Sequence, residues 1–272
     1  MHRVRVTSYP GDLREFFVAS AVKMSPMDTA RIAELLQPFL ANTVPATSSE
    51  DLSFRASASP EESAFLAPVQ LRNISTYIDL LLRWNARINL TAVRQPEEIV
   101  TRHFGESLFA ARCLLHETPG LSHPARVSRG GRANAHLIDV GSGAGFPGLP
   151  VKIWVPDLHL TLIESNHKKA TFLREVARTL TLTNVDVFSG RAEDYAGDLA
   201  DVATLRAVEH FEAAVPIAVR LVVPGGRVAM LIGAAQATRA RDLAPDLVWD
   251  KEITIPLSSN RILLLGARGA AE

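Results

Sequence analysis

The sequence predicts an α/β protein of the Rossmann-like class, with helices on both faces of a mostly parallel sheet of about seven strands. Apolar segments of strand length alternate with amphipathic segments of helix length through the second half of the chain. The stretch LIDVGSGAGFPG, residues 137–148, joins a buried strand to four glycines in eight positions. Acidic residues, Asp139 and Glu164, lie at the ends of two successive apolar runs, as at the nucleoside-binding corner of such a sheet.

The negative charge of Asp139 discriminates between the possible nucleoside ligands. The pyrophosphate of a dinucleotide would be repelled by this carboxylate, whereas S-adenosylmethionine carries an ammonium and a sulfonium that it attracts. The glycine loop, Gly141, Gly143 and Gly145, therefore favours S-adenosylmethionine over NAD. Leu149 and Pro150 follow where a phosphate-binding loop needs Lys and Ser or Thr, so no nucleoside triphosphatase is indicated.

Composition indicates an ordinary globular protein. Of 272 residues, 47% are hydrophobic. The 29 Lys plus Arg residues balance 29 Asp plus Glu, so the net charge does not indicate a nucleic-acid or membrane partner. The single cysteine, Cys113, excludes an internal disulfide and a cysteine metal cluster. The N-terminus lacks the apolar run of a signal peptide, and no stretch reaches the ~20 apolar residues of a membrane span. We expect a cytoplasmic, monomeric protein that binds neither a metal nor a membrane.

Residues 1–58 are predicted to form an N-terminal extension and linker. One helix is expected at Thr29–Leu40, with Asp28 as its N-cap. Between Ala41 and Ser63 the composition turns to Ser, Thr, Ala and Pro, which is typical of a mobile linker. One interpretation is that the helix packs on the domain as an added helix. The favoured interpretation is an ornamental extension outside the working part of the protein.

Residues 59–117 are predicted to form a helical N-terminal segment. Helices are expected over 71–85 and 97–115, separated by a turn in which an aromatic residue, amides and arginines are mixed. Such a surface suits RNA or phosphate. The alternative is that the apolar members are core and the charged members a solvated face, with His103 structural. The candidate RNA-binding residues here are Arg83, Arg87, Arg102 and His103.

The chain from 136 to 272 is predicted to be the ligand-binding domain, after a loop at 118–135. We expect its helices from Pro147, at 168–180 and at 209–220. The expected strands are 137–140, 159–163, 185–188, 202–205, 227–232, one near 247–255 and one at 261–265.

Ligands of such sheets lie outside the carboxyl ends of the strands. That rule selects the loop from Asp139 to Phe146, together with Glu164, Glu193 and Arg206. Glu164 is placed to hold ribose hydroxyls, and Glu193 either reads the adenine edge or caps a turn. An arginine directly after an apolar strand is costly unless paired, so a functional role is favoured for Arg206.

These motifs together resemble the bacterial 16S ribosomal RNA guanine-N7 methyltransferase family, RsmG or GidB. The resemblance runs from about Ile74 to Leu265. Its carriers are LRWN at 82–85 with NLT at 89–91, Arg102-His103, the loop DVGSGAGFPG at 139–148, Glu164-Ser165 with Lys168-Lys169 and Phe172-Leu173, Arg191-Ala192-Glu193, and Arg206-Ala207.

The resemblance implies transfer of a methyl group from S-adenosylmethionine to N7 of one guanine in 16S RNA, in the decoding region of the small ribosomal subunit. It implies the seven-stranded methyltransferase sheet and cofactor positions at Gly141, Phe146, Ala192, Glu193 and Arg206. Lys168 and Lys169 join the RNA-binding candidates. No catalytic residue is expected, because guanine N7 carries a lone pair and no proton at neutral pH.

The chain departs from the family pattern in three places. Ile232 stands where the family usually has Lys, which removes a positive charge near the expected substrate mouth. Glu106 stands where relatives commonly have Asp, and residues 1–58 have no assigned counterpart. A small-molecule methyltransferase is the alternative function, since it uses the same cofactor corner. An NAD-binding or scaffold protein is disfavoured by Asp139.

Overall fold

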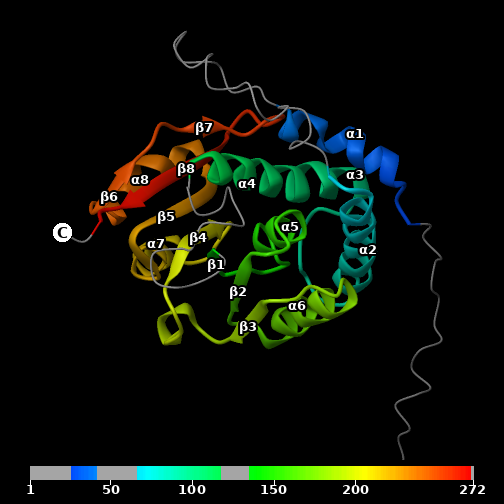
Figure 1. The fold of residues 1–272 in the computed structure, drawn as a ribbon, viewed down its shortest axis with the longest axis horizontal. Coiled ribbons are helices and arrows are strands. Elements are labelled where there is room, and N and C mark those ends of the chain that lie inside the picture. The colour runs from blue at the N-terminus through cyan, green and yellow to red at the C-terminus, as the bar shows by residue number, and fades with distance from the viewer. Residues whose placement is uncertain (1–25, 42–65, 118–134, 271–272) are drawn as a thin grey trace, which may run out of the picture.

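The computed structural model describes residues 26–41, 66–117 and 135–270, and its centre is one eight-stranded sheet (Figure 1). Along the sheet the strands follow the order β3-β2-β1-β4-β5-β8-β6, and β7 pairs with β8. The strands are β1 His136–Val140, β2 His159–Glu164, β3 Val185–Ser189, β4 Ala200–Arg206, β5 Val222–Gly233, β6 Leu247–Trp249, β7 Ile253–Thr254 and β8 Arg261–Arg268.

Seven of these strands run in one direction, and β8 alone runs in the opposite direction. β1 to β5 pair in parallel, whereas β8 runs antiparallel to β5, β6 and β7. The predicted mostly parallel sheet with helices on both faces is therefore confirmed. The strand expected near 247–255 is two short strands, β6 and β7, so the sheet has eight strands instead of about seven.

Successive side chains of the strands pack alternately into two separate hydrophobic cores, one on each face of the sheet. In β1, Leu137 joins the core on one face and Ile138 the core on the other, as the two-residue period of a strand requires. One face is covered by α5 Gly148–Trp154 and α6 His167–Thr179, and the other by α7 Phe211–Arg220 and α8 Ala237–Leu243. The glycine loop enters α5 directly after Pro147.

Helices before the sheet domain pack onto the face that carries α5 and α6. α1 Thr29–Leu40 begins at Asp28, whose carboxylate accepts a hydrogen bond from Ala30 N, as predicted. Ile32, Leu36 and Phe39 are almost completely buried in the same core as α2 Pro68–Asn85. The interpretation of residues 29–40 as an ornamental extension is therefore wrong, because the apolar stripe of α1 is part of the main core.

The helix predicted at 97–115 is three consecutive helical segments. α3 Pro96–Ile99 is followed by a π-helix, η3 Val100–Gly105, and by α4 Glu106–Glu117. The wider π turn carries His103 and places Gly105 against the Phe39 ring of α1, where a side chain on residue 105 would collide with the ring. α1 packs against η3, and Arg31 of α1 forms an ion pair with Glu97 of α3 at 2.9 Å (Figure 1).

Two predicted segments lie outside the described residues. They are the linker of 42–63 and most of the loop at 118–135. Within the described ranges, no helix combines the length and the apolar character that crossing a membrane requires.

Candidate functional site

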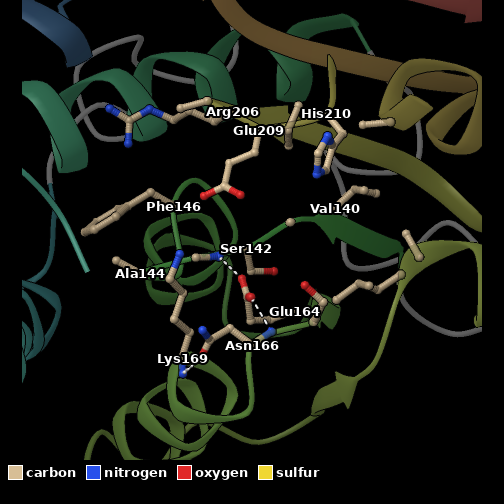
Figure 2. A pocket seen from close by; sticks show the side chains of 18 of the residues that line it. Val140, Ser142, Ala144, Phe146, Glu164, Asn166, Lys169, Arg206, Glu209 and His210 are labelled. Atoms are coloured by element: carbon tan, nitrogen blue, oxygen red, sulfur yellow. Dashed lines mark hydrogen bonds between the residues drawn. The ribbon is translucent and has the colours of Figure 1, made fainter. Parts of the chain in front are cut away.

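A cavity of about 600 Å³ opens at the carboxyl ends of the parallel strands, where β1 and β4 lie next to each other. At this point the chain order reverses, since β2 and β3 lie to one side of β1 and β4 and β5 to the other, which is where ligands bind in such sheets. The volume suits a ligand the size of a nucleoside derivative. Figure 2 shows side chains from the strand ends converging on this space.

One wall of the cavity, here called the loop wall, comprises Gly141–Ala144, Phe146, Glu164 and Glu193. Gly141 and Gly143 have φ angles of +68° and +57°, which glycine adopts without strain. The Gly143 amide donates to Glu164 Oε2 at 2.8 Å, and Asn166 N donates to Glu164 Oε1 at 2.7 Å. Glu164 thus ties the loop to the end of β2 and, with further lone pairs on both oxygens, can still accept hydrogen bonds from ribose hydroxyls.

Asp139 lies beneath the loop and is not among the described residues that line the cavity. Its Oδ1 accepts a hydrogen bond from Thr204 Oγ1 at 2.7 Å, and its Oδ2 accepts from Gly148 N at 3.3 Å. Burial raises the pKa of this carboxyl to about 6, although Thr204 and the Gly148 amide favour the charged form. The expectation that Asp139 meets the positive charges of the ligand is corrected: it holds the loop against β4 and α5.

Gly145 serves packing, because it does not line the cavity either. Its φ is +88°, and a side chain here would collide with the Tyr77 hydroxyl and with Leu149. Tyr77, from α2, donates a hydrogen bond to the Ala144 carbonyl and stacks against Phe146, with ring centroids 5.5 Å apart. This contact fixes the glycine loop to the helical segment, and the sequence carried no signal for it.

Arg206 extends from the end of β4 to the π-helix η3. Its Nη2 donates to Arg102 O at 2.6 Å, to His103 Nδ1 at 3.0 Å and to Glu106 Oε2 at 3.0 Å. Its guanidinium also lies over the Phe146 ring. Burial lowers the pKa of Arg206 to about 10, and Glu106 opposes this shift. Glu106 supplies the counter-charge that a buried arginine requires, and the functional role predicted for Arg206 stays a prediction.

His103 is held as a neutral ring. Because an arginine has no acceptor, the contact with Arg206 requires a lone pair on Nδ1, which leaves the proton of the neutral ring on Nε2, 2.7 Å from Thr91 Oγ1. The ring stacks on Phe146 at 4.7 Å. Burial, followed by the charges of Arg206, Arg102 and Arg261, lowers the pKa of His103 to about 3. Neither ring nitrogen is available to take a proton at neutral pH.

Arg261, at the start of β8, was not predicted as a site residue. Its Nη2 lies 2.9 Å from Glu106 Oε2, the carboxylate oxygen that Arg206 also contacts. Sequence motifs gave no indication of these pairs, since Glu106 precedes Arg206 by 100 residues and precedes Arg261 by more. The second wall, here called the arginine wall, comprises Arg102, His103, Glu106, Arg206 and Arg261.

The turn after β4 adds two further residues that sequence reasoning missed. Ala207 has a φ of +50°, which is uncommon for a residue with a side chain, and Val208 then packs closely over Gly141. Glu209 and His210 follow and line the cavity. Figure 2 shows the Glu209 carboxylate pointing toward the glycine loop.

The remaining predicted residues divide between the cavity and the outer surface. Ala192 and Glu193, in the 3-10 helix η4 Ala192–Asp194, line the cavity, as do Arg102 and Lys169. The other RNA-binding candidates are not among its lining residues: Arg83, Arg87 and Lys168. In the part of the chain that the structure describes, no group of three or more His, Cys, Asp or Glu side chains could hold a metal ion.

The sheet order, the glycine loop and the acid at the end of β2 define a Rossmann-like, S-adenosylmethionine-dependent methyltransferase. Comparison with known proteins then identifies the family. Residues 70–259 match the GidB family, described as rRNA small subunit methyltransferase G, and the chain belongs to this family.

Individual relatives agree with this assignment. The chain is 41% identical over 182 residues to ribosomal RNA small subunit methyltransferase G of Roseiflexus castenholzii, covering 63% of this chain and 70% of the relative. It is 37% identical over 179 residues to the protein of the same name from Streptococcus pyogenes, covering 63% and 69%. Among solved structures, a ribosomal protein L11 methylase from Lactobacillus delbrueckii matches 61% of this chain and 79% of its own length, with 12% identity and a TM-score of 0.48.

Proposed function

We propose that this protein transfers the methyl group of S-adenosylmethionine to N7 of one guanine of 16S ribosomal RNA, in the decoding region of the small subunit. The observation that carries the proposal is the match of residues 70–259 to a family of small-subunit rRNA methyltransferases. The cavity supports it, because one wall offers acceptors for a nucleoside and the other offers arginines. The natural partner would be 16S RNA or the small subunit, in the cytoplasm.

The residues of the loop wall fit S-adenosylmethionine. Gly141 and Gly143 carry no side chain toward the cavity, so a ligand can approach the loop backbone. Glu164 would hold the ribose, and Ala192 and Glu193 would lie next to the adenine. When bound, this cofactor supplies an electrophilic methyl group on its sulfonium. Phe146 closes the site from the side of the helical segment and helps to exclude water.

The reaction needs no general base, and the arginine wall supplies none. Guanine N7 offers a lone pair, so the chain has only to align the base with the methyl group. His103 has its two ring nitrogens engaged by Arg206 and Thr91, and its low pKa keeps it neutral. We infer that His103 positions Phe146 and Arg206, and that it takes no proton.

A small metabolite is the alternative substrate. The charges of Arg102, Arg206 and Arg261, together with Lys169, favour a polyanionic substrate over a neutral metabolite. The alternative would be supported only if a free nucleoside were methylated as well as RNA.

The proposal is tested by offering radiolabelled S-adenosylmethionine with protein-free 16S RNA, with small subunits lacking the modification, and with free guanosine. We expect label in one of the RNA substrates, as 7-methylguanosine after digestion to nucleosides, and none in free guanosine. Gly141→Val serves as the inactive control, since Gly141 has a positive φ and contacts Val208. Label in another nucleoside, or in guanosine alone, would contradict the proposal.

A further inference from the structure

Arg261 and Arg206 share one buried carboxylate and retain unused hydrogen-bonding capacity. Glu106 Oε2 lies 3.0 Å from Arg206 Nη2 and 2.9 Å from Arg261 Nη2, and the Glu106 side chain is only 4% exposed. Two guanidinium groups and one carboxylate leave one positive charge without a counter-charge inside this group. Buried charges are normally paired, so the cluster favours a further anion.

The two arginines also lack hydrogen-bond acceptors. Arg206 Nε, Arg261 Nε and Arg261 Nη2 are buried and make no hydrogen bond within the described part of the chain. The Arg261 contact with Glu106 is thus an ion pair without hydrogen-bond geometry. Leaving such donors unsatisfied is costly, and a bound oxyanion would offer acceptors to guanidinium groups.

The backbone of Arg261 is anchored on both sides. Its amide donates to Ser258 Oγ at 3.1 Å, and its carbonyl accepts from Ile255 N at 3.1 Å. Because β8 is antiparallel to β5, Arg261 pairs with Gly233 at the end of β5 and so reaches the edge at which the parallel strands end. The side chain lines the cavity and remains 21% exposed. An anion from solvent can therefore reach the exposed part of this side chain, whose Nε and Nη2 atoms are themselves buried.

The position of Arg261 indicates which ligand it serves. The loop wall spans the ends of β3, β2 and β1, whereas β8 lies two strands beyond β4, roughly 10 Å away at the spacing of paired strands. Arg261 thus lies at the end of the cavity away from the loop wall, where the cofactor is expected. Ile232 of β5 is buried in the opposite core and contributes nothing to this edge.

We propose that Arg261, held with Arg206 by the positioning residue Glu106, forms a subsite for a phosphodiester group of the substrate RNA next to the target nucleotide. This proposal rests on the proposed function, since it concerns the RNA substrate of the same cavity. The carboxylate of S-adenosylmethionine has similar oxyanion chemistry, so the experiment must separate the two sources.

The test measures two affinities for Arg261→Gln and Arg261→Lys. Cofactor affinity is measured by calorimetry, and 16S RNA affinity by filter binding across a salt series at fixed Mg²⁺. We expect Arg261→Gln to weaken RNA binding about tenfold and to reduce the slope of log K against log salt by about 0.7–0.9, with cofactor affinity within about twofold. Arg261→Lys keeps the charge, so the slope should return to the wild-type value while affinity recovers only in part.

Arg241→Gln is the matched control. It removes an arginine that is similarly exposed and paired with a carboxylate, Glu252, but does not line the cavity. It should change neither affinity. Weakened cofactor binding with an unchanged RNA slope in Arg261→Gln would assign the anion to the cofactor carboxylate and overturn the subsite, as would no change in either affinity. Failure of the wild-type protein to bind or methylate RNA would instead overturn the proposed function, and the subsite with it.

Discussion

The two walls of the cavity are built by different means. In the loop wall and directly beneath it, backbone amides are held by carboxylates close in sequence: Gly143 N by Glu164, 21 residues away, and Gly148 N by Asp139, nine residues away. In the arginine wall, side chains meet across large separations, with Arg206 bound to Glu106 and His103 over 100 and 103 residues. The first wall is a local motif, and the second is a product of the tertiary fold.

This difference predicts different sensitivities. Backbone donors keep their positions when a neighbouring side chain changes, so damage to the loop wall should appear mainly as lost space or a shifted loop. Buried side-chain charges depend on one another, so removing one member of the arginine wall should leave the others uncompensated. Phe146 belongs to the loop and contacts His103 and Arg206, and through it the two walls meet.

The largest effect is expected from Glu106→Ala, which leaves Arg206 and Arg261 without their shared carboxylate. Breaking a buried pair in this way should lower the free energy of unfolding by about 3–5 kcal/mol, as measured by denaturant titration. Glu98→Ala is the control, because its ion pair with Arg102 at 3.1 Å is exposed and should contribute no more than ~0.5 kcal/mol. A loss below ~1 kcal/mol in Glu106→Ala would show that the arginines do not depend on this carboxylate.

A somewhat smaller effect is expected from Gly145→Ala in the glycine loop. The change adds a side chain at a φ of +88° in a place already filled by Tyr77 and Leu149, so we expect a loss of about 2–4 kcal/mol in thermal or chemical unfolding. Gly225→Ala separates strain from crowding, since Gly225 has a φ of +78° and open space around it. Its loss should be about 1–2 kcal/mol. Equal losses at both positions would refute the packing role of Gly145.

Asp139→Asn should weaken the binding of S-adenosylmethionine by about 1–3 kcal/mol in calorimetric titration, without direct contact to the ligand. An amide cannot accept hydrogen bonds through two oxygens, so either Thr204 or the Gly148 amide loses its acceptor and the loop shifts. Unchanged affinity in the folded variant would show that the loop keeps its shape without this carboxylate.

The same variant has a pH signature with a definite sign. Since burial raises the pKa of Asp139 from 3.8 to about 6, the folded protein holds this proton more tightly than the unfolded chain, and wild-type stability falls as pH rises from about 4 to about 6. Asp139→Asn lacks this loss. The stability of the variant relative to wild type should therefore rise by up to about 3 kcal/mol over that interval. If the difference in free energy of unfolding between the two proteins did not change with pH, the buried charge on Asp139 would be contradicted.

Sequence reasoning succeeded where structure is local. The strand, the glycine loop and Glu164 lie within about thirty residues, and the regular alternation of strands and helices indicated the parallel sheet. It failed for Asp139, because its charge suggested a ligand while its depth below the loop depends on the packing of β4 and α5. It missed Tyr77, Glu106 as a partner of arginines, and Arg261, since only the folded chain brings α2, α4 and β8 to the cavity.

The role of α1 was misjudged for the same reason. Its helical pattern and N-cap were recognised correctly, but the neighbouring composition, rich in Ser, Thr, Ala and Pro, favoured an extension. What decides its role is the partner surface: Phe39 packs on Gly105 of the π-helix, beneath the arginine wall. No spacing rule within residues 29–40 contains that information.

The central claim, methyl transfer by positioning without a general base, is tested most directly by the pH dependence of single-turnover methylation. At saturating RNA and cofactor, the rate should be nearly flat from about pH 7 to 8.5, because His103 and Asp139 have pKa values of about 3 and about 6 and have finished titrating below that range. His103→Gln should lower the rate without changing the shape of the profile. A steep rise through this range, abolished by His103→Gln, would contradict the claim and show that His103 takes a proton.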